Sequence, residues 1–148
     1  MKTYYEKNQI GYVLLLILFV TGFLLFFKIR SDILLILLSI LGIVTLLFYK
    51  LKILVTEEAI IVIFGIGLIK KKMKLSEIKK DSIQKVKIPW YTGIGIRLTS
   101  HGVLYNVAIG EGLYLKSKSG NKRFFVVSKD YDKLSSILKT AIDDRLKK

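Results

Sequence analysis

Two long uncharged stretches decide the fold of this chain: IGYVLLLILFVTGFLLFF at Ile10–Phe27 and ILLILLSILGIVTLLFY at Ile33–Tyr49. They contain 18 and 17 residues and are separated only by residues 28–32, Lys-Ile-Arg-Ser-Asp. A helix rises about 1.5 Å per residue, so each stretch comes close to the hydrocarbon thickness of a bilayer, roughly 30 Å. Backbone inside lipid must satisfy its own hydrogen bonds. The stretches therefore predict a transmembrane hairpin of two helices, 10–27 and 33–49.

Two other interpretations of these stretches are weaker. Lys2 and Lys7 provide the basic start of a secretory signal, but no A-x-A-like cleavage site follows and the second stretch begins almost at once. Core helices of a water-soluble protein would need a large apolar mass around them, and only residues 50–148 remain to supply it. Neither stretch contains an ionisable residue, which is the usual mark of an ion pathway. The hairpin is therefore predicted to be an anchor.

The distribution of charge predicts an orientation. The chain has a net charge of +14, and residues 50–148 hold 21 of its 25 Lys and Arg with 9 of its 11 Asp and Glu. Basic segments favour the cytoplasmic side, although the residues nearest the apolar stretches give only a slight bias. We expect a multi-pass membrane protein with both termini and the C-terminal domain in the cytoplasm. Cysteine is absent, which excludes disulfides and a cysteine nucleophile.

The domain organisation follows from a change in residue pattern at Lys50. Residues 1–9 are predicted to be a polar lead-in, 10–49 the hairpin, and 50–148 a cytoplasmic domain. Residues 53–127 are rich in β-branched residues interrupted by Gly and Ser turns, which predicts about seven strands in a small sandwich or barrel. After Tyr131 the apolar residues recur with helical spacing, which predicts one amphipathic C-terminal helix. The predicted fold class is α+β.

The residues after Lys52 resemble a known family, the bacterial pleckstrin-homology-like (PH-like) domains in the form with an N-terminal two-helix anchor. The resemblance covers about 52–146 and rests on short motifs: Trp-Tyr-Thr-Gly-Ile-Gly-Ile-Arg at 90–97, Tyr-Asn at 105–106, Gly-Glu-Gly-Leu at 110–113 and Gly-Asn-Lys at 120–122. It implies a β-sandwich or barrel of about seven strands closed by a helix. It also implies an interaction or scaffold module without catalytic residues. The basic phosphoinositide-binding motif of some eukaryotic relatives is not visible.

Two groups of residues are candidates for binding. The basic run Lys70, Lys71, Lys72 and Lys74 could contact anionic lipid headgroups, each Lys near the surface contributing about 1 kcal/mol. A solvated edge strand, whose lysines prevent sheet-to-sheet association, explains the same run and is slightly favoured. Trp90, Tyr91 and Arg97 form a candidate partner groove, for which packing of the loop around Trp90 is the simpler explanation.

The sequence lacks the motifs of an enzyme or of a cofactor site. Three G-x-G pairs occur, but none opens a helix as a phosphate-binding loop requires. His101 is the only histidine, whereas a zinc site needs three or four ligands. We therefore predict no catalytic, cofactor-binding or metal-binding residues, no cofactor and no enzyme activity. The basic charge also suits nucleic acid, but no stripe of aromatic and basic residues supports that partner, and none is predicted.

The predicted function combines the anchor and the domain. The leading hypothesis is a membrane-anchored, non-catalytic PH-like protein that acts as a protein-interaction or self-association scaffold at the cytoplasmic membrane. Its partners would be the lipid bilayer, as an integral membrane protein, and either another protein or further copies of itself. The alternative is a peripheral sensor of anionic lipid headgroups that binds through the basic face at Lys70–Lys74. A small enzyme or transporter subunit would need polar groups that the sequence lacks.

Overall fold

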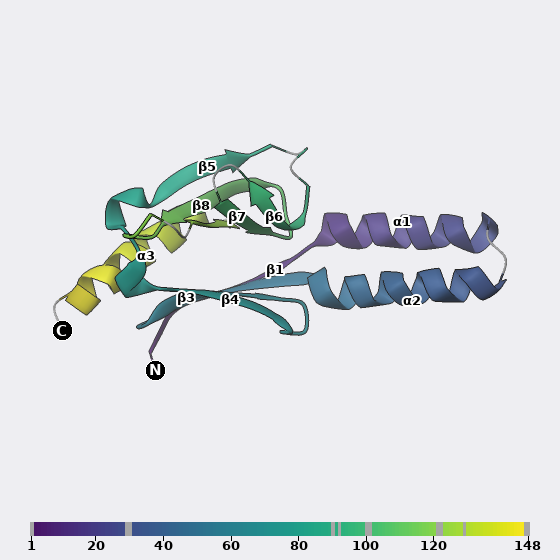
Figure 1. The fold of residues 1–148 in the computed structure, drawn as a ribbon, viewed down its shortest axis with the longest axis horizontal. Coiled ribbons are helices and arrows are strands. Elements are labelled where there is room, and N and C mark those ends of the chain that lie inside the picture. Colours follow the sequence, from purple (N-terminus) through teal and green to yellow (C-terminus); the bar gives the residue numbers. More distant parts are fainter. Residues whose placement is uncertain are drawn as a thin grey trace.

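The computed structural model describes residues 2–28, 31–89, 91, 93–99, 102–120, 123–128 and 130–146. In these residues the protein is α+β, with nine strands in two sheets and three α-helices (Figure 1). The elements, in order, are β1 (Thr3–Ile10), α1 (Tyr12–Lys28), α2 (Ser31–Phe48), β2 (Lys50–Thr56), β3 (Ala59–Phe64), β4 (Ile69–Lys74), the 3-10 turns η1 (Leu75–Glu77) and η2 (Lys80–Ser82), β5 (Gln84–Ile88), β6 (Gly95–Thr99), β7 (Gly102–Asn106), β8 (Gly110–Lys116), β9 (Arg123–Val127) and α3 (Tyr131–Leu146).

The two sheets face each other and enclose the main core. The first sheet has the order β1-β2-β3-β4 and is antiparallel throughout. The second has the order β5-β8-β9-β7-β6, in which only the β7–β9 pair is parallel among the described strands. Figure 1 shows the sheets as two layers with α3 at one end and the α1–α2 hairpin projecting from the other. The core is built from both inner faces and from one face of α3, with Leu134 and Leu138 fully buried.

The amino-terminal segment corrects the prediction of a polar lead-in. Residues 3–10 form β1, which pairs with β2 from Thr3↔Thr56 to Ile10↔Lys50. Alternate side chains of this strand turn inward, and Tyr5 and Gln9 are buried. The structure therefore begins with a strand of the first sheet, and the helical hairpin is inserted between two neighbouring strands.

Both hairpin helices form at the apolar stretches, but the predicted transmembrane hairpin is wrong. Among the described residues, no helix combines the length and the apolar character that crossing a membrane requires. The physical reason is length. Helices α1 and α2 contain 17 and 18 residues, or roughly 26 Å at 1.5 Å per residue, which falls short of a hydrocarbon core of about 30 Å. Ile10 and Tyr49, which the apolar stretches include, lie outside the helices. The predicted multi-pass location in a bacterial membrane depended on this transmembrane hairpin and is corrected together with it.

The base of the hairpin is joined to the first sheet by backbone hydrogen bonds. The Gly11 amide donates to the Tyr49 carbonyl (N···O 2.8 Å), which extends the β1–β2 ladder to the start of α1. The Ile66 amide, in the turn between β3 and β4, donates to the Leu46 carbonyl (3.2 Å). Gly65 has a φ of +50°, and a Cβ at this position would overlap the carbonyl oxygen of Leu46. The turn can approach the end of α2 only because residue 65 is glycine.

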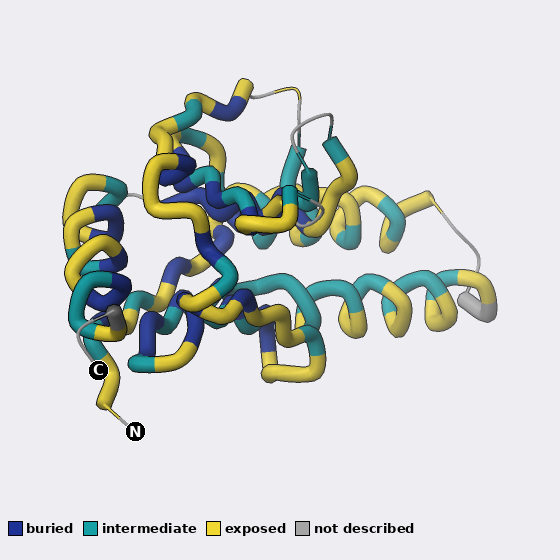
Figure 2. The backbone as a smooth tube through the Cα atoms, turned by 60° about the vertical axis from the view of Figure 1, so that its left-hand side comes forward, coloured by how far each residue is buried: buried dark blue, intermediate teal, exposed yellow. Residues whose placement is uncertain are grey.

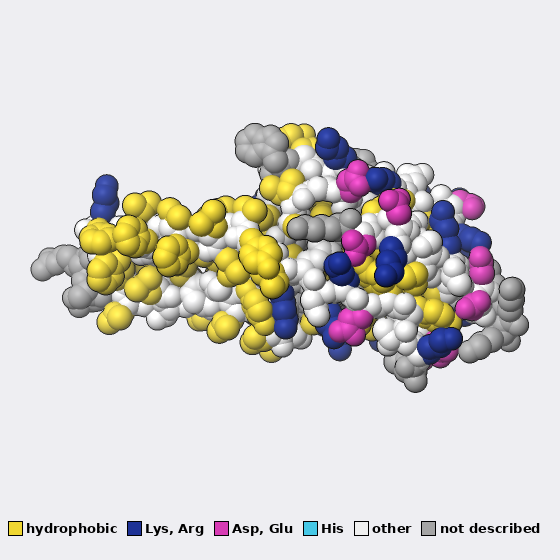
Figure 3. All heavy atoms as spheres, turned by 180° about the vertical axis from the view of Figure 1, so that it is seen from behind, with side chains coloured by type: hydrophobic (Ala, Val, Ile, Leu, Met, Phe, Trp, Pro, Cys, Tyr) yellow, Lys and Arg dark blue, Asp and Glu magenta, His cyan; other side chains and the backbone are white. Residues whose placement is uncertain are grey.

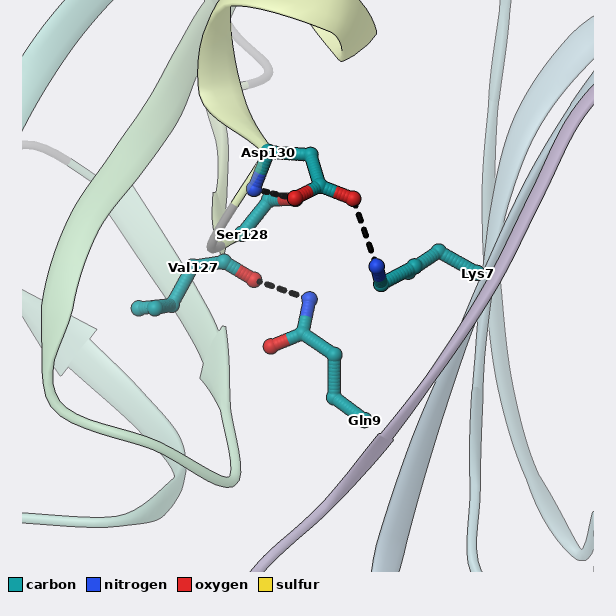
Figure 4. A network of polar contacts seen from close by, with 5 residues as sticks. All are labelled: Lys7, Gln9, Val127, Ser128 and Asp130. Carbon is teal, nitrogen blue, oxygen red and sulfur yellow. Dashed lines mark hydrogen bonds and ion pairs between the residues drawn. The ribbon is translucent and has the colours of Figure 1, made fainter.

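A polar seam connects β1 to the junction between β9 and α3 (Figure 4). The Gln9 Nε2 atom donates to the Val127 carbonyl at 3.0 Å. The Lys7 ammonium pairs with the Asp130 carboxylate at 2.6 Å, and the Asp130 amide donates to the Ser128 hydroxyl at 3.3 Å. The hydrogen bond between Lys7 and Asp130 is the main cause of the raised pKa of Lys7 and of the lowered pKa of Asp130. The seam holds the strand that leads into the hairpin against the second sheet and the start of α3.

Candidate functional site

The first candidate site is a groove between the two sheets, at the edge where β4 ends the first sheet. The second sheet has one strand more than the first, and its outermost strand, β6, extends beyond the cover that β4 provides. The pairings Leu98↔Val103 and Val103↔Phe124 place these three side chains in one row across the inner face. Phe124 is buried in the core, whereas Leu98 is 89% exposed. The apolar inner face therefore continues past the core and becomes the floor of an open groove.

Lys71 lies on the core-facing side of β4. It pairs with Val62 of β3, while its neighbours two residues away, Ile69 and Met73, pair with Phe64 and Ile60. The three β3 residues are at most 1% exposed, and residues directly opposite one another in a sheet share a face. Lys71 therefore occupies an inward position on an edge strand and borders the groove. It forms no ion pair with any residue that the structure describes.

The groove has an apolar floor and a basic rim. It has a volume of about 380 Å³ and is lined by residues of four strands, β4, β6, β7 and β9: Lys71, Lys72, Met73, Leu98, Gly102, Val103, Tyr105, Arg123 and Phe124. Three of these described lining residues are cationic, and none of them is acidic. Burial raises the pKa of Tyr105, so its hydroxyl stays neutral at physiological pH. We refer to this site as the intersheet groove.

The other lysines of the predicted basic run point away from the core. Lys70 and Lys72 alternate with Lys71 along β4, and Lys74 ends the strand. All four lysines are exposed on this edge strand. The run therefore divides between the two faces of the sheet: Lys71 borders the intersheet groove on the inner face, and Lys70 and Lys74 take outer-face positions.

The second predicted group, around Trp90, is only partly described. Trp90 itself and His101 lie outside the described residues. Tyr91 is 75% exposed, and the guanidinium group of Arg97, on β6, lies against Gly93. Neither Tyr91 nor Arg97 lines the intersheet groove. The candidate partner groove at Trp90, Tyr91 and Arg97 stays a prediction.

The second candidate site is the apolar hairpin, which we define as α1 and α2. Figure 3 shows hydrophobic side chains along the visible length of the hairpin, with one basic side chain at its far end, whereas the other charged side chains gather on the body and at the base of the hairpin. No side chain of α1 is buried, and Figure 2 shows no buried segment along either helix. Large apolar side chains that are at least 45% exposed occur on both helices: Tyr12, Val13, Leu16, Ile17, Phe19, Val20, Phe23, Leu24, Phe26 and Phe27 on α1, and Ile33, Leu35, Ile36, Ile40, Ile43 and Leu46 on α2.

Four of the carboxylates on the body are paired with lysines at its surface. The pairs are Glu6–Lys52, Asp130–Lys7, Asp143–Lys80 and Glu111–Lys85, with N···O distances of 2.5–2.6 Å. Each partner is substantially exposed, so these contacts stabilise the fold only weakly. Within the described residues, no group of three or more His, Asp or Glu side chains is arranged to hold a metal ion.

Comparisons of the chain with protein-family models, with curated proteins and with solved structures found no match. The predicted membership of the bacterial PH-like domains is therefore corrected. No family model supports it, and within the part of the chain that the structure describes no helix is long and apolar enough to form the two-helix transmembrane anchor that belonged to it. The motifs that suggested the family are short turns built around glycine, and such turns recur in unrelated β-proteins wherever the backbone needs a positive φ.

Sequence reasoning missed the intersheet groove. Its floor comes from Met73, Leu98, Tyr105 and Phe124, which are distant in the sequence and meet only because the sheets stack. One local signal was present. In the run from Ile69 to Lys74, strand periodicity places Lys71 on the same face as Ile69 and Met73, which singles it out from the other lysines.

Proposed function

We propose that this protein is a non-catalytic interaction module that binds lipid acyl chains through its apolar hairpin and holds the two-sheet body at the lipid surface for contact with a protein partner. The observation that carries the proposal is the exposure of large apolar side chains around the whole circumference of the hairpin. Contact with acyl chains needs an apolar surface. It does not need a helix that crosses a bilayer.

The exposed apolar side chains cover the outward half of each helix. On α1 they occupy positions 12, 13, 16, 17, 19, 20, 23, 24, 26 and 27, an arc of about 180° at 3.6 residues per turn, and the opposite half, which holds Gly22, faces Leu38 and Leu41 of α2. A helix on the surface of a water-soluble protein has a polar face opposite its apolar face, whereas a helix that is apolar all round is found in an apolar environment. Water alone would be an unfavourable environment, because each Å² of exposed apolar surface costs about 25 cal/mol relative to burial.

Two hydroxyl groups in the middle of α2 bond within their own helix. The Ser39 hydroxyl donates to the Leu35 carbonyl at 2.7 Å, and the Thr45 hydroxyl donates to the Leu41 carbonyl at 2.8 Å. Surroundings without water leave a hydroxyl no other partner, and such bonds to the preceding turn remove its desolvation cost. These two polar side chains are therefore compatible with acyl chains on the outside of the hairpin.

A second copy of the chain explains the hairpin less well. Two hairpins that pack together would form a four-helix bundle, in which each helix turns one face to the centre and another to water. The outward faces of such a bundle would here still carry residues such as Phe19, Phe26 and Leu35, each more than 60% exposed. Acyl chains can cover the outward faces of both helices at once.

The body adds an apolar shoulder at the base of the hairpin. Ile10 precedes α1, and Ile66 and Leu68 lie in the β3–β4 turn that contacts the end of α2. These side chains are 45%, 56% and 75% exposed. The Lys50 ammonium lies 5.2 Å from the ring centre of Tyr49, so the apolar surface is followed at once by an aromatic and a basic residue. Aromatic and basic side chains are favoured at the boundary between acyl chains and water.

Flotation of the full chain with vesicles tests the proposal. We expect the protein to float with vesicles of zwitterionic phosphatidylcholine and to stay bound in high salt, because burial of apolar surface is not screened by ions. The double variant Phe19→Glu, Phe26→Glu should lose most of this binding. Both side chains are exposed, so the substitutions should leave the fold of the body intact, which circular dichroism would check. Lys85→Glu together with Glu111→Lys, on the body, is the matched control and should float like the unchanged protein.

Two results would overturn the proposal. One is a protein that remains a defined, lipid-free oligomer in detergent-free buffer and does not float, which would assign the hairpin to self-association. The other is flotation that persists in the Phe19→Glu, Phe26→Glu variant. Sedimentation of the same samples without vesicles separates the first result from aggregation.

The lysines of β4 favour a secondary role in reading anionic headgroups. They are exposed, and β4 runs roughly parallel to the long axis of the hairpin (Figure 1). A strand rises about 3.3 Å per residue, so Lys70 lies closest to the hairpin end and Lys74 about 13 Å further away. Attraction to an anionic surface falls within a Debye length, about 8 Å at physiological salt. Binding that depends wholly on anionic lipid and disappears in high salt would make this the main function.

A further inference from the structure

We propose that the intersheet groove is a binding site for a single-chain amphiphilic anion, a ligand with an alkyl chain and a carboxylate or phosphate head. Lys71 would pair with the head, and the apolar floor would hold the chain. This inference goes beyond the proposed function, because the groove lies on the body and shares no residue with the hairpin.

Lys71 supplies a cation on the inner face of β4. An inward lysine on an edge strand places a flexible, solvent-exposed cationic group beside a core face, where it can reach an anion held in the groove. Four other lysines of this protein, Lys7, Lys52, Lys80 and Lys85, have carboxylate partners. Lys71 has no carboxylate partner among the described residues, and on β4 it shares the inner face only with Ile69 and Met73. Its ammonium is therefore available to an anion that binds in the groove.

The floor of the groove is apolar and only partly covered by the protein. Met73, Tyr105 and Phe124 are between 3% and 6% exposed, whereas Leu98 and Val103 continue the same surface outward. A simple inorganic anion would use the rim but would leave this floor in contact with water. An alkyl chain would cover Leu98, which is 89% exposed, and would remove apolar area from water. The floor therefore selects a ligand with an apolar part.

The size and charge of the groove suit a small anionic ligand. Its volume of about 380 Å³ falls in the range of small-molecule sites, roughly 300–1,000 Å³. Lys71, Lys72 and Arg123 line it and no described lining residue is acidic, so these residues give it a positive potential. Apolar walls with a few convergent polar groups are the usual composition of a ligand site. Lysines that only prevent sheet association would need no apolar pocket beside them.

The chain contains its own reporter for this site. Methionine occurs only at positions 1 and 73, and Met73 lines the groove. Full-length protein labelled with ¹³C in the methionine methyl groups should give two NMR signals, and Met73→Leu assigns them. The protein is kept in neutral nanodiscs, and four probes are added: octanoate, octyl phosphate, octanol and inorganic phosphate. The two anionic amphiphiles compare carboxylate with phosphate, and the other two probes test the chain and the head separately.

We expect saturable movement of the Met73 signal with octanoate, octyl phosphate or both, while the Met1 signal stays unchanged. Octanol and inorganic phosphate should each bind at least about tenfold more weakly, because octanol loses the charge-assisted hydrogen bond to Lys71 and inorganic phosphate loses the burial of an alkyl chain. Lys71→Gln should weaken the anionic amphiphile by a similar factor. Lys70→Gln is the matched control on the outer face and should bind like the unchanged protein.

Three results would overturn the inference: a Met73 signal that moves with no probe, one that moves equally with octanol and octanoate, or equal binding in the Lys71→Gln and Lys70→Gln variants. The outcome is independent of the hairpin, because probes that merely enter the nanodisc shift Met73 without saturation and without dependence on Lys71. Flotation of the same protein reports on the proposed function separately.

Discussion

Gln9 donates a hydrogen bond from its side-chain Nε2 to the main-chain carbonyl of Val127 at 3.0 Å, across the gap between the first and the second sheet. Gln9 is only 6% exposed, and its Oε1 has no hydrogen-bond partner among the described residues. The contact ties the strand before the hairpin to the opposite layer of the body. It also leaves one buried acceptor without a donor, which makes the site sensitive to small chemical changes.

Gln9→Glu should destabilise the protein by about 1–3 kcal/mol at neutral pH, because it replaces the donor to Val127 with a buried carboxylate. Burial should raise the pKa of the new carboxyl. Its penalty should therefore be small below about pH 4.3, the ordinary value for Glu, and should grow as the pH rises through the raised pKa. Urea unfolding at several pH values measures this. Gln84→Glu, at an exposed position of β5, is the control and should show no such penalty.

Removal of the Lys7–Asp130 ion pair should flatten the pH dependence of stability at both ends. The pair lowers the pKa of Asp130, so its contribution is present above pH 3.8, the ordinary value, and is lost as the pH falls through the lowered pKa. The pair raises the pKa of Lys7, so that contribution is present below pH 10.5 and is lost as the pH rises through the raised pKa. Both side chains are more than a third exposed, so the effect should be small.

Melting temperatures of Asp130→Asn and Lys7→Met across the pH range test this ion pair. Each variant should lose the same acid-side dependence, and the double variant should lose no more than either one alone. A double variant whose losses are additive would show that the two residues act independently.

Gly65→Ala should loosen the junction between the hairpin and the first sheet. The residue has a left-handed φ of +50°, which costs a residue with a side chain about 1–2 kcal/mol. The added Cβ would also overlap the carbonyl oxygens of Leu46 and Leu47. Hydrogen exchange of the Ile66 amide, which bonds to Leu46, should accelerate. Gly67→Ala separates the two causes, because φ there is +98° but the nearest atom to a new Cβ lies 3.8 Å away. Equal effects at both positions would exclude the overlap as a cause.

Asn106→Asp should destabilise the loop before β6 by about 1–3 kcal/mol for each donor that is lost. The fully buried Asn106 amide donates to the carbonyls of Gly93 and Ala108, at 2.8 and 3.2 Å, and accepts from the Gly95 amide at 3.1 Å. A carboxylate keeps only the accepting role. Denaturant unfolding measures the loss, and Asn8→Asp on the exposed face of β1 is the control. A loss no larger than that of the control would show that the loop does not depend on these bonds.

Sequence reasoning located the helices well because each has a strong local signal. The hairpin helices are continuous apolar runs, and α3 follows from the helical spacing of Leu134, Leu138 and Ala141, all of which are buried. The predicted membrane crossing was wrong because the helices, at 17 and 18 residues, are too short to span a bilayer and one end of each apolar run is not helical. Ile10 belongs to β1 and Tyr49 accepts a bond from Gly11, so both ends of the runs serve the sheet junction.

The first strand was not predicted from the sequence because its inward residues are mostly polar. Tyr5, Lys7 and Gln9 face the second sheet and α3, so β1 lacks the apolar–polar alternation that marks a half-buried strand. The intersheet groove could not be predicted either. Its floor depends on the offset between a four-stranded and a five-stranded sheet, which no local pattern encodes.

The insertion of the hairpin between β1 and β2 gives the chain a modular architecture. Ile10 pairs directly with Lys50, and Gly11 bonds to Tyr49, so the two strands are already in the register of an ordinary β-hairpin where the helices leave the body. A two-residue turn can join strands in that register. Residues 12–48 could thus be exchanged for a short turn, or for another helical hairpin, without a change in strand order. Evolution or design could vary the attachment device and the sandwich separately.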